Sequence, residues 1–207
     1  MSHKIFIIGL PRTGTTSVCH AFLQLGYLTA HTCYTKACLA QAEVIADTPI
    51  YYDFEQLDAL YPGSKFVYLN RDMALWLPSI KQLLQRMQHN LTRQDGGFNP
   101  HIKRCFLETF TPFTEHNIGQ DGFLTDCYLR HQHYVESYFH HRENDLLSID
   151  ISAPESFAKL LAFINKESNI KGFEKLNMGG KVTAWNQIKH PNKVQSTHNG
   201  KIDKHIY

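Results

Sequence analysis

The sequence predicts a three-layer α/β/α domain in which helices cover both faces of a mainly parallel β-sheet. Short apolar runs rich in β-branched residues alternate with longer segments of helical periodicity. The apolar runs lack polar alternation, which is typical of strands that are buried on both faces. With 207 residues, 43% of them hydrophobic, the chain is long enough for one such domain and hardly for two. We therefore expect residues 1–207 to form a single domain with helical insertions.

The first predicted strand, residues 4–8, leads into a glycine-framed loop, residues 9–14, and then into an amphipathic segment that starts at Thr15. A strand, a tight loop and a helix start direct backbone N–H groups and a helix dipole at one point, which makes a phosphate cradle. The spacing resembles the P-loop pattern G-x4-G-K-[ST], with Thr16 at the hydroxyl position but Thr15 in place of the lysine. Because that lysine contacts the phosphates of a nucleoside triphosphate, ATP or GTP hydrolysis is disfavoured. The alternative is a glycine turn that only joins a strand to a helix.

A cation, Arg12, lies inside this loop after Pro11. The run P-R-T-G-T-T-S resembles the 5′-phosphosulfate loop of the sulfotransferases that use 3′-phosphoadenosine 5′-phosphosulfate (PAPS). Cytosolic members carry P-K-S-G-T-T-W there, and tyrosylprotein members carry P-R-S-G-T-T. The cofactor-binding residues that the resemblance implies in this loop are Pro11, Arg12, Thr13, Gly14, Thr15, Thr16 and Ser17. It also implies that Arg12 stabilises charge on the departing 3′-phosphoadenosine 5′-phosphate (PAP). Ser17 replaces the tryptophan that stacks on adenine in cytosolic members, so the adenine contacts must differ.

Composition narrows the classes of function. The formal net charge of +2 is too small to indicate a nucleic-acid-binding protein. No apolar run approaches the length of a transmembrane helix, and a core strand that starts at residue 4 leaves no room for a signal peptide. The five cysteines are odd in number and include no CxxC pair, which indicates reduced thiols. We expect a cytoplasmic protein, unlike the membrane-anchored sulfotransferases of the Golgi.

Residues 27–30 predict a short second strand, followed by His31, Cys33 and Cys38. A zinc site would need a fourth ligand and better spacing, so we expect no metal there. Residues 41–50 predict a strand whose carboxyl end delivers Asp47 to a ligand crevice.

Asp47 stands in the run Asp47-Thr48-Pro49. Cytosolic sulfotransferases carry K-T-H-L-P at the comparable place, and aligning proline with proline puts their catalytic histidine at Asp47. The resemblance therefore implies that Asp47 is the base that takes a proton from an acceptor hydroxyl. The alternative is that Asp47 only caps the following turn. Both interpretations stay open.

The next segments predict a helix over residues 54–61, a core strand over residues 65–70 and a helix over residues 72–90. We expect this last helix to place Leu75, Ile80, Leu83, Leu84 and Met87 on its inward face, and Pro78 to kink it or shift its start. Arg71 follows the strand directly, and Ser79 comes eight residues later. Sulfotransferases bind the 3′-phosphate of PAPS with an arginine and a serine at this spacing, so the resemblance assigns that role to Arg71 and Ser79.

Residues 91–123 form an aromatic-rich insertion. It could be a lid over an acceptor pocket or the core of a helical subdomain, and we favour core packing. Beyond it, the sequence predicts a helix over residues 127–141, a strand over residues 145–151 and a helix from 154 to about 164.

The tail, from about residue 181 to 207, carries five lysines and one aspartate, a local charge of +4. This composition indicates an exposed basic arm, although Trp185 argues that part of it packs. Gly179-Gly180-Lys181 loosely resembles, in reversed order, the late R-K-G loop with which sulfotransferases close the 3′-phosphate site. The resemblance thus adds Lys181 to the expected cofactor contacts.

Taken together, the resemblance implies transfer of a sulfuryl group from PAPS to a hydroxyl or amine, with PAP as product and no metal. The acceptor would be a small molecule, a glycan or a lipid, and no pattern identifies it or the oligomeric state. A P-loop nucleotide or nucleoside kinase is the second class, with Asp150 as its magnesium ligand. The third class is a non-catalytic protein that binds PAP or PAPS.

Overall fold

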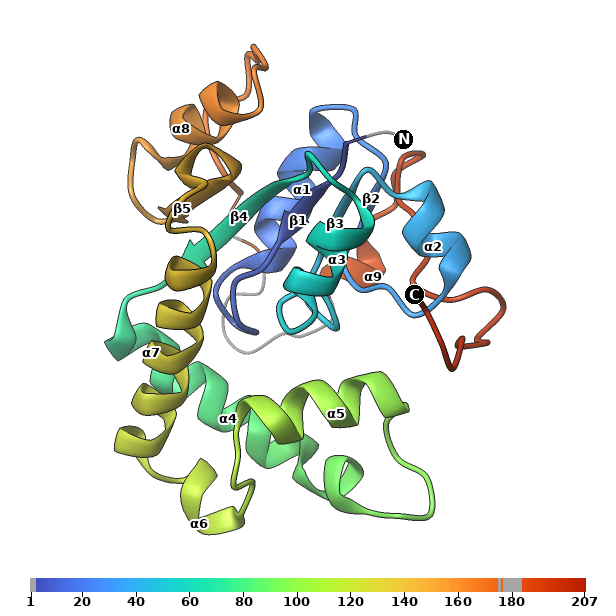
Figure 1. The fold of residues 1–207 in the computed structure, drawn as a ribbon, viewed down its shortest axis with the longest axis vertical. Helices are drawn as coiled ribbons and strands as arrows, with labels where there is room; N and C mark the ends of the chain where they lie inside the picture. The colour runs from blue at the N-terminus through green and yellow to red at the C-terminus, as the bar shows by residue number, and fades with distance from the viewer. Residues whose placement is uncertain (1–2, 175, 177–183) are drawn as a thin grey trace.

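The computed structural model describes residues 3–174, 176 and 184–207 (Figure 1). Within them, five parallel strands form one sheet in the order β2-β3-β1-β4-β5. The strands span Ile5–Ile7 (β1), Thr29–Ala30 (β2), Val44–Ala46 (β3), Lys65–Asn70 (β4) and Leu146–Asp150 (β5). The predicted α/β class with a parallel sheet is confirmed.

The central strand β1 explains why the apolar runs show no polar alternation. Phe6 pairs in register with Ile45 of β3 and Phe66 of β4. Successive residues of a strand point to opposite faces, and both faces of β1 are covered. Phe6 and Ile8 belong to one apolar cluster and Ile7 belongs to another.

Helices cover both faces of the sheet. The cluster that contains Ile7 includes residues of α1 (Thr15–Gln24), α8 (Ser156–Phe163) and α9 (Ala184–Gln187). The cluster that contains Phe6 includes residues of α2 (Lys36–Gln41), α3 (Phe54–Leu60) and α7 (Asp121–Tyr138). These two apolar clusters make the three layers that the sequence predicts.

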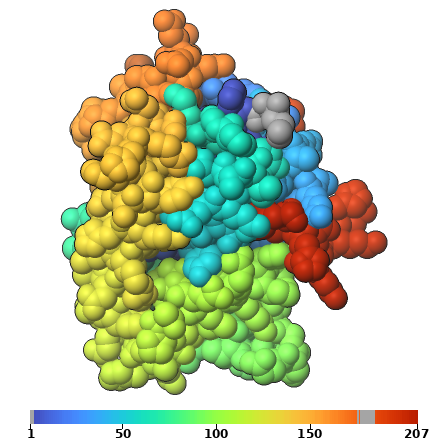
Figure 2. All heavy atoms as spheres, in the orientation of Figure 1, coloured from blue at the N-terminus to red at the C-terminus, as the bar shows by residue number. Residues whose placement is uncertain are grey.

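A further group of helices lies beyond the carboxyl ends of the strands (Figures 1 and 2). It consists of α4 (Met73–Thr92), α5 (Pro100–Thr109), α6 (Glu115–Ile118) and the first half of α7. Outside this group, a one-turn 3-10 helix (Glu143–Asp145) precedes β5. Phe106 and Phe110 are buried in the apolar cluster that joins these helices. The expectation that residues 91–123 form a packed helical subdomain is therefore confirmed.

Helix α4 begins at Met73, where the Asp72 carboxylate accepts a hydrogen bond from the Leu75 N–H at 3.2 Å, and it continues through Pro78. The predicted inward face is wrong at one position. Leu75 is 56% exposed, whereas Trp76 is fully buried. Neighbouring helical residues point about 100° apart, so the face set by Trp76, Ile80 and Leu84 turns Leu75 away from the core.

The chain end packs against the domain. Val194 and Ile206 are buried in the cluster around Phe6, and Thr29 of β2 forms an isolated parallel bridge with Lys193. The Tyr207 hydroxyl donates to the Asp53 carboxylate at 2.7 Å. Figure 2 shows the last residues lying against the segment around α2. The predicted exposed basic character holds at Lys189, Lys201 and Lys204, and the packing expected at Trp185 is confirmed. The segment is not a free arm, however, because Val194 and Ile206 also anchor it to the core.

Candidate functional site

One cavity of about 840 Å³ lies at the carboxyl edge of the sheet. The strand order places β1 between β3 and β4, and the chain leaves β1 and β4 in opposite directions along the sheet. Ligands of open α/β sheets bind at such a switch point. Residues at or just after the carboxyl ends of all five strands line the cavity: Arg12 after β1, His31 after β2, Asp47 after β3, Arg71 after β4 and Asp150 at the end of β5.

The structure gathers the residues that the sequence analysis singled out. The following predicted site residues line this single cavity: Pro11, Arg12, Thr13, Gly14, Thr15, Thr16, Ser17, Asp47, Arg71 and Ser79. Lys181 lies outside the described residues. The predicted positions thus come together although their segments are far apart in the sequence.

Two glycines fix the course of the loop after β1. A Cβ atom on Gly9 would lie 2.6 Å from the Leu69 Cβ, so β4 passes too close for any side chain. Gly14 has a φ of 105° and would place a Cβ 2.3 Å from the Ile151 Cδ1. Only glycine satisfies both constraints at these positions without strain. A residue with a side chain at either position would therefore strain the backbone of this loop.

Two side-chain hydrogen bonds hold the same loop in place. The Thr13 hydroxyl donates to the Leu10 carbonyl at 2.7 Å, and the buried indole N–H of Trp76 donates to the Pro11 carbonyl at 3.0 Å. Arg12 is held between them with a φ of 74°, in the left-handed region. Trp76 was not predicted as a site residue, since its only signal in the sequence is a tryptophan on an amphipathic helix. This contact ties the loop to α4.

Helix α1 starts directly after the loop, with Gly14 before its first residue, Thr15. The first turn of a helix carries N–H groups that have no partner within the helix and attracts anions. Thr15, Thr16 and Ser17 are buried at this end and line the cavity. The Ser17 hydroxyl accepts a hydrogen bond from the Leu176 N–H at 3.2 Å. The arrangement has the features of the predicted phosphate cradle.

Two arginines converge beside the cradle. The Arg12 Nε donates to the Ser79 hydroxyl at 2.8 Å, and the Arg71 guanidinium donates to the Arg12 carbonyl. Burial lowers the pKa of Arg12, and the neighbouring charge of Arg71 lowers it further. Burial also lowers the pKa of Arg71, which the charge of Asp150 opposes. The pair concentrates positive charge at the edge of the cavity.

Arg12 and Arg71 differ from two other arginines in their salt-bridge partners. Arg104 and Arg142 form salt bridges with Asp53 and Asp58 at 2.6 and 2.5 Å. Among the described residues, neither Arg12 nor Arg71 forms a salt bridge. Guanidinium groups without a salt-bridge partner in a partly buried cavity suit a multiply charged anion such as a phosphate ester.

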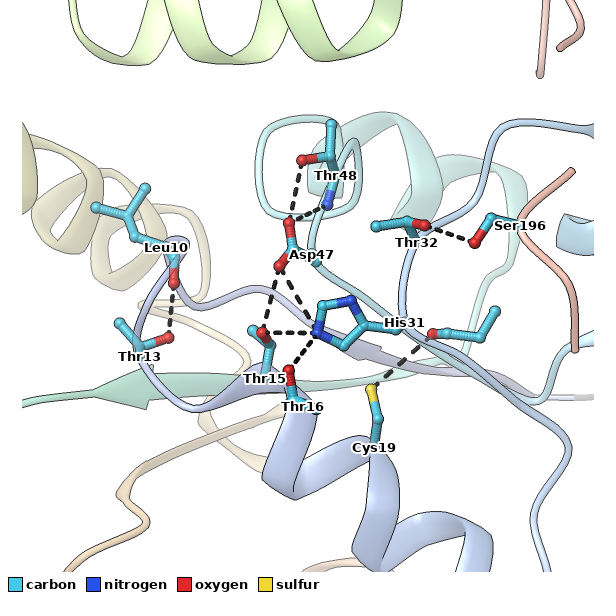
Figure 3. A network of polar contacts seen from close by, with 11 residues as sticks. Leu10, Thr13, Thr15, Thr16, Cys19, His31, Thr32, Asp47, Thr48 and Ser196 are labelled. Atoms are coloured by element: carbon cyan, nitrogen blue, oxygen red, sulfur yellow. Dashed lines mark hydrogen bonds and ion pairs between the residues drawn. The ribbon is translucent and has the colours of Figure 1, made fainter. Parts of the chain in front are cut away.

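Asp47 follows β3 with a φ of 59° and faces the loop (Figure 3). Its Oδ1 accepts from the backbone N–H and the hydroxyl of Thr48 at 2.8 and 3.1 Å. Its Oδ2 accepts from the Thr15 hydroxyl at 3.3 Å. One carboxylate oxygen therefore serves the local turn while the other reaches the phosphate cradle, and the cap and the base remain compatible roles.

His31 lies next to this carboxylate, and the sequence analysis considered it only as a zinc ligand. Its Nε2 lies 3.2 Å from the Thr15 hydroxyl, 2.9 Å from the Thr16 hydroxyl and 3.8 Å from the Asp47 Oδ2 (Figure 3). The available signal was its position directly after a short strand, the same signal that identified Asp47.

The cavity has two halves of different character. The polar half consists of the loop, the start of α1, Arg71 and Ser79, and near it Phe157 and Phe173 meet edge to face with centroids 5.1 Å apart. The apolar half lies toward α4 and α5, and Figure 3 shows a helix of that layer across from Asp47. Its lining residues are Tyr34, Leu83, Met87, Ile102 and Phe106. Asp47 and Thr48 also line the cavity.

A search of the described residues finds no group of three or more side chains arranged to hold a metal ion. Asp150, the candidate magnesium ligand of a kinase, instead accepts from the backbone N–H and the hydroxyl of Ser152 at 2.8 and 2.7 Å. All five cysteines are free and buried. None of the described helices combines the length and the apolar character required to cross a membrane.

Comparison with protein families identifies a match to the family model described as "Sulfotransferase domain", over residues 4–37 and 33–182. The matched region contains all five strands and the residues Arg12, Asp47, Arg71 and Ser79. A search of curated proteins finds no match to the chain.

Proposed function

The chain belongs to the sulfotransferase domain family, and we propose that it transfers a sulfuryl group from PAPS to an acceptor hydroxyl. The observation that carries this proposal is the cluster of Arg12, Ser79 and Arg71 beside the glycine loop. PAPS carries two phosphate centres on one ribose. A site for it needs two adjacent anion-binding groups, and the glycine loop together with Arg71 and Ser79 supports such an arrangement.

The polar half supports a specific placement of the nucleotide. The loop of residues 11–17 and the first turn of α1 would hold the 5′-phosphosulfate. Arg71 and Ser79 would hold the 3′-phosphate through charge-assisted and hydroxyl hydrogen bonds. Phe157 and Phe173 would offer aromatic surface to the adenine, in place of the tryptophan that Ser17 replaces.

Asp47 would act as the general base. The acceptor oxygen attacks the sulfur of PAPS, a new S–O bond forms, and the bond between sulfur and the phosphate oxygen breaks. The proton of the hydroxyl passes to the Asp47 carboxylate, and PAP leaves with the electron pair of the broken bond. Arg12 would stabilise the negative charge that develops on PAP.

The apolar half supports a class of acceptor. Within the apolar half, Leu83, Met87, Ile102 and Phe106 offer no hydrogen-bonding group to a ligand, and only Tyr34 carries a hydroxyl. A glycan would leave most of its hydroxyls unpaired against such a wall, which costs free energy for each buried polar group. An alcohol or phenol on an apolar body would bury that body there and present its hydroxyl to Asp47.

Isothermal titration calorimetry with PAP tests the donor, with ADP plus Mg²⁺ run in parallel. We expect micromolar binding of PAP and much weaker binding of ADP. Magnesium-dependent binding of ADP or ATP without binding of PAP would overturn the proposal in favour of a kinase. Turnover of PAPS with 2-naphthol, and with an oligosaccharide of similar size as comparison, then tests the acceptor class.

A further inference from the structure

His31 takes no part in the reaction as proposed so far, yet it is fixed from several sides. The Trp185 ring lies against the imidazole, with centroids 5.5 Å apart and an angle of 32° between the planes. Lys193 in turn lies over the Trp185 ring, 5.0 Å from its centroid, and donates to the Trp185 carbonyl at 2.6 Å. The chain end thereby braces a residue of the cavity.

The hydrogen bonds around His31 determine which ring nitrogen carries the proton. A threonine hydroxyl has one hydrogen, and that of Thr15 goes to the Asp47 Oδ2. With that hydrogen on Asp47, the contact between Thr15 and His31 requires an imidazole that donates from Nε2. The same N–H faces the Thr16 hydroxyl at 2.9 Å. The result is a directed chain of donors from His31 through Thr15 to Asp47.

We propose that His31 is a positioning residue of the sulfuryl-transfer site, which fixes the Thr15 hydroxyl and through it the orientation of the Asp47 carboxylate. The inference rests on the proposed function for the reaction and on the hydrogen bonds among His31, Thr15 and Asp47 for the geometry. The imidazole acts through Thr15.

The charge of the ring suits this role. Burial lowers the pKa of His31, the carboxylate of Asp47 raises it, and Lys193 lowers it. A neutral imidazole donates a hydrogen bond without pairing with the carboxylate as an ion. An arginine or lysine at this position would bind the Asp47 carboxylate directly and weaken it as a proton acceptor. Histidine supplies direction while leaving the base its charge.

Kinetics of two substitutions tests the role. His31→Phe keeps a ring against Trp185 and removes the N–H, and His31→Gln restores a donor of similar reach. With PAPS and 2-naphthol, we expect His31→Phe to lower kcat about 10- to 100-fold. The affinity for PAP should fall much less than kcat, because the contacts proposed for the 3′-phosphate, Arg71 and Ser79, do not involve His31. His31→Gln should recover part of the lost kcat.

His20→Gln is the matched control. His20 lies on α1, and its side chain is 17% exposed, against 15% for His31, but its partner is Glu174. We expect wild-type kinetics from this variant. Wild-type kcat in His31→Phe would overturn the inference, and so would equal losses of PAP affinity in both His31 variants. Thermal unfolding of each variant shows whether it folds. If His31→Phe does not fold, the kinetics of His31→Gln and the NMR spectrum of the wild-type His31 ring test the inference instead.

The ring spectrum needs neither PAPS nor an acceptor. Nitrogen-15 NMR of labelled histidine in the wild-type protein at pH 7 should show a neutral His31 ring protonated at Nε2. A ring protonated at Nδ1 alone, or a charged ring, would overturn the inference. Failure of the wild type to bind PAP would instead overturn the proposed function. The tautomer of His31 would still test the hydrogen bonds from His31 through Thr15 to Asp47. The two failures are thus distinguishable.

Discussion

The two halves of the cavity are built by different means. The polar half depends on backbone geometry, with Gly14 at a φ of 105° and Arg12 at a φ of 74°. The apolar half depends on side chains of α4 and α5, such as Met87 and Phe106. A phosphate cradle restricts the residues that can form it and so leaves a motif. An apolar wall restricts only volume and hydrophobicity, and many sequences meet that requirement.

The largest expected effect comes from Asp47, the proposed base. Asp47→Asn keeps the shape and an acceptor oxygen for Thr48 but removes the basic carboxylate. We expect kcat with PAPS to fall about 10²- to 10⁴-fold, the range of general acid–base catalysis, while the calorimetric affinity for PAP changes little. A kcat near that of wild type would show that Asp47 only caps the turn and that the base lies elsewhere.

Arg71 tests the polar half alone. Arg71→Ala removes a charge-assisted hydrogen bond to phosphate, worth about 1.5–3 kcal/mol, so we expect the Kd for PAP to rise about 10- to 150-fold. Arg71→Lys should fall between, because lysine keeps the charge but lacks the planar fork. Arg93→Ala is the control, since Arg93 pairs with Asp95 and does not line the cavity. Unchanged PAP binding in Arg71→Ala would show that Arg71 does not bind the 3′-phosphate.

Met87 tests the apolar half alone. Met87→Ala should raise the KM for 2-naphthol about 10-fold, since lost apolar contact in a pocket is worth about 1–3 kcal/mol. The Kd for PAP should not move. Met73→Ala is the matched control, because Met73 is also a partly buried residue of α4 but does not line the cavity. A shift in PAP affinity without a shift in KM would contradict the division into halves.

The smallest effect on ligand binding is expected from Trp76, which connects α4 to the loop of the polar half. Trp76→Phe keeps an aromatic ring in the core and removes the donor to the Pro11 carbonyl. An unsatisfied buried acceptor costs about 1–3 kcal/mol, so the free energy of unfolding in urea should fall by that amount. PAP affinity should weaken only a few-fold, as the loop loses one brace. A stability equal to that of wild type would show that water replaces the indole.

The sequence by itself determined the local units. The strand, loop and helix of residues 4–24, the strand Lys65–Asn70 and the helix over residues 54–60 follow from apolar runs, helical spacing and glycine positions. The resemblance in residues 11–17 led to the sulfotransferase family, which the family comparison confirms. These features are recognisable because neighbouring residues within about one turn or one loop decide them.

The tertiary structure alone decided which of these units meet. The bond between Arg12 and Ser79 joins residues 67 positions apart. His31 contacts Thr15 although β3 lies between β2 and β1 in the sheet. The burial of Trp76 in place of Leu75, and the packing of residues 184–207, depend on surfaces contributed by other segments. Hydrophobic burial is non-directional, so a local pattern marks a face as apolar without naming the face that covers it.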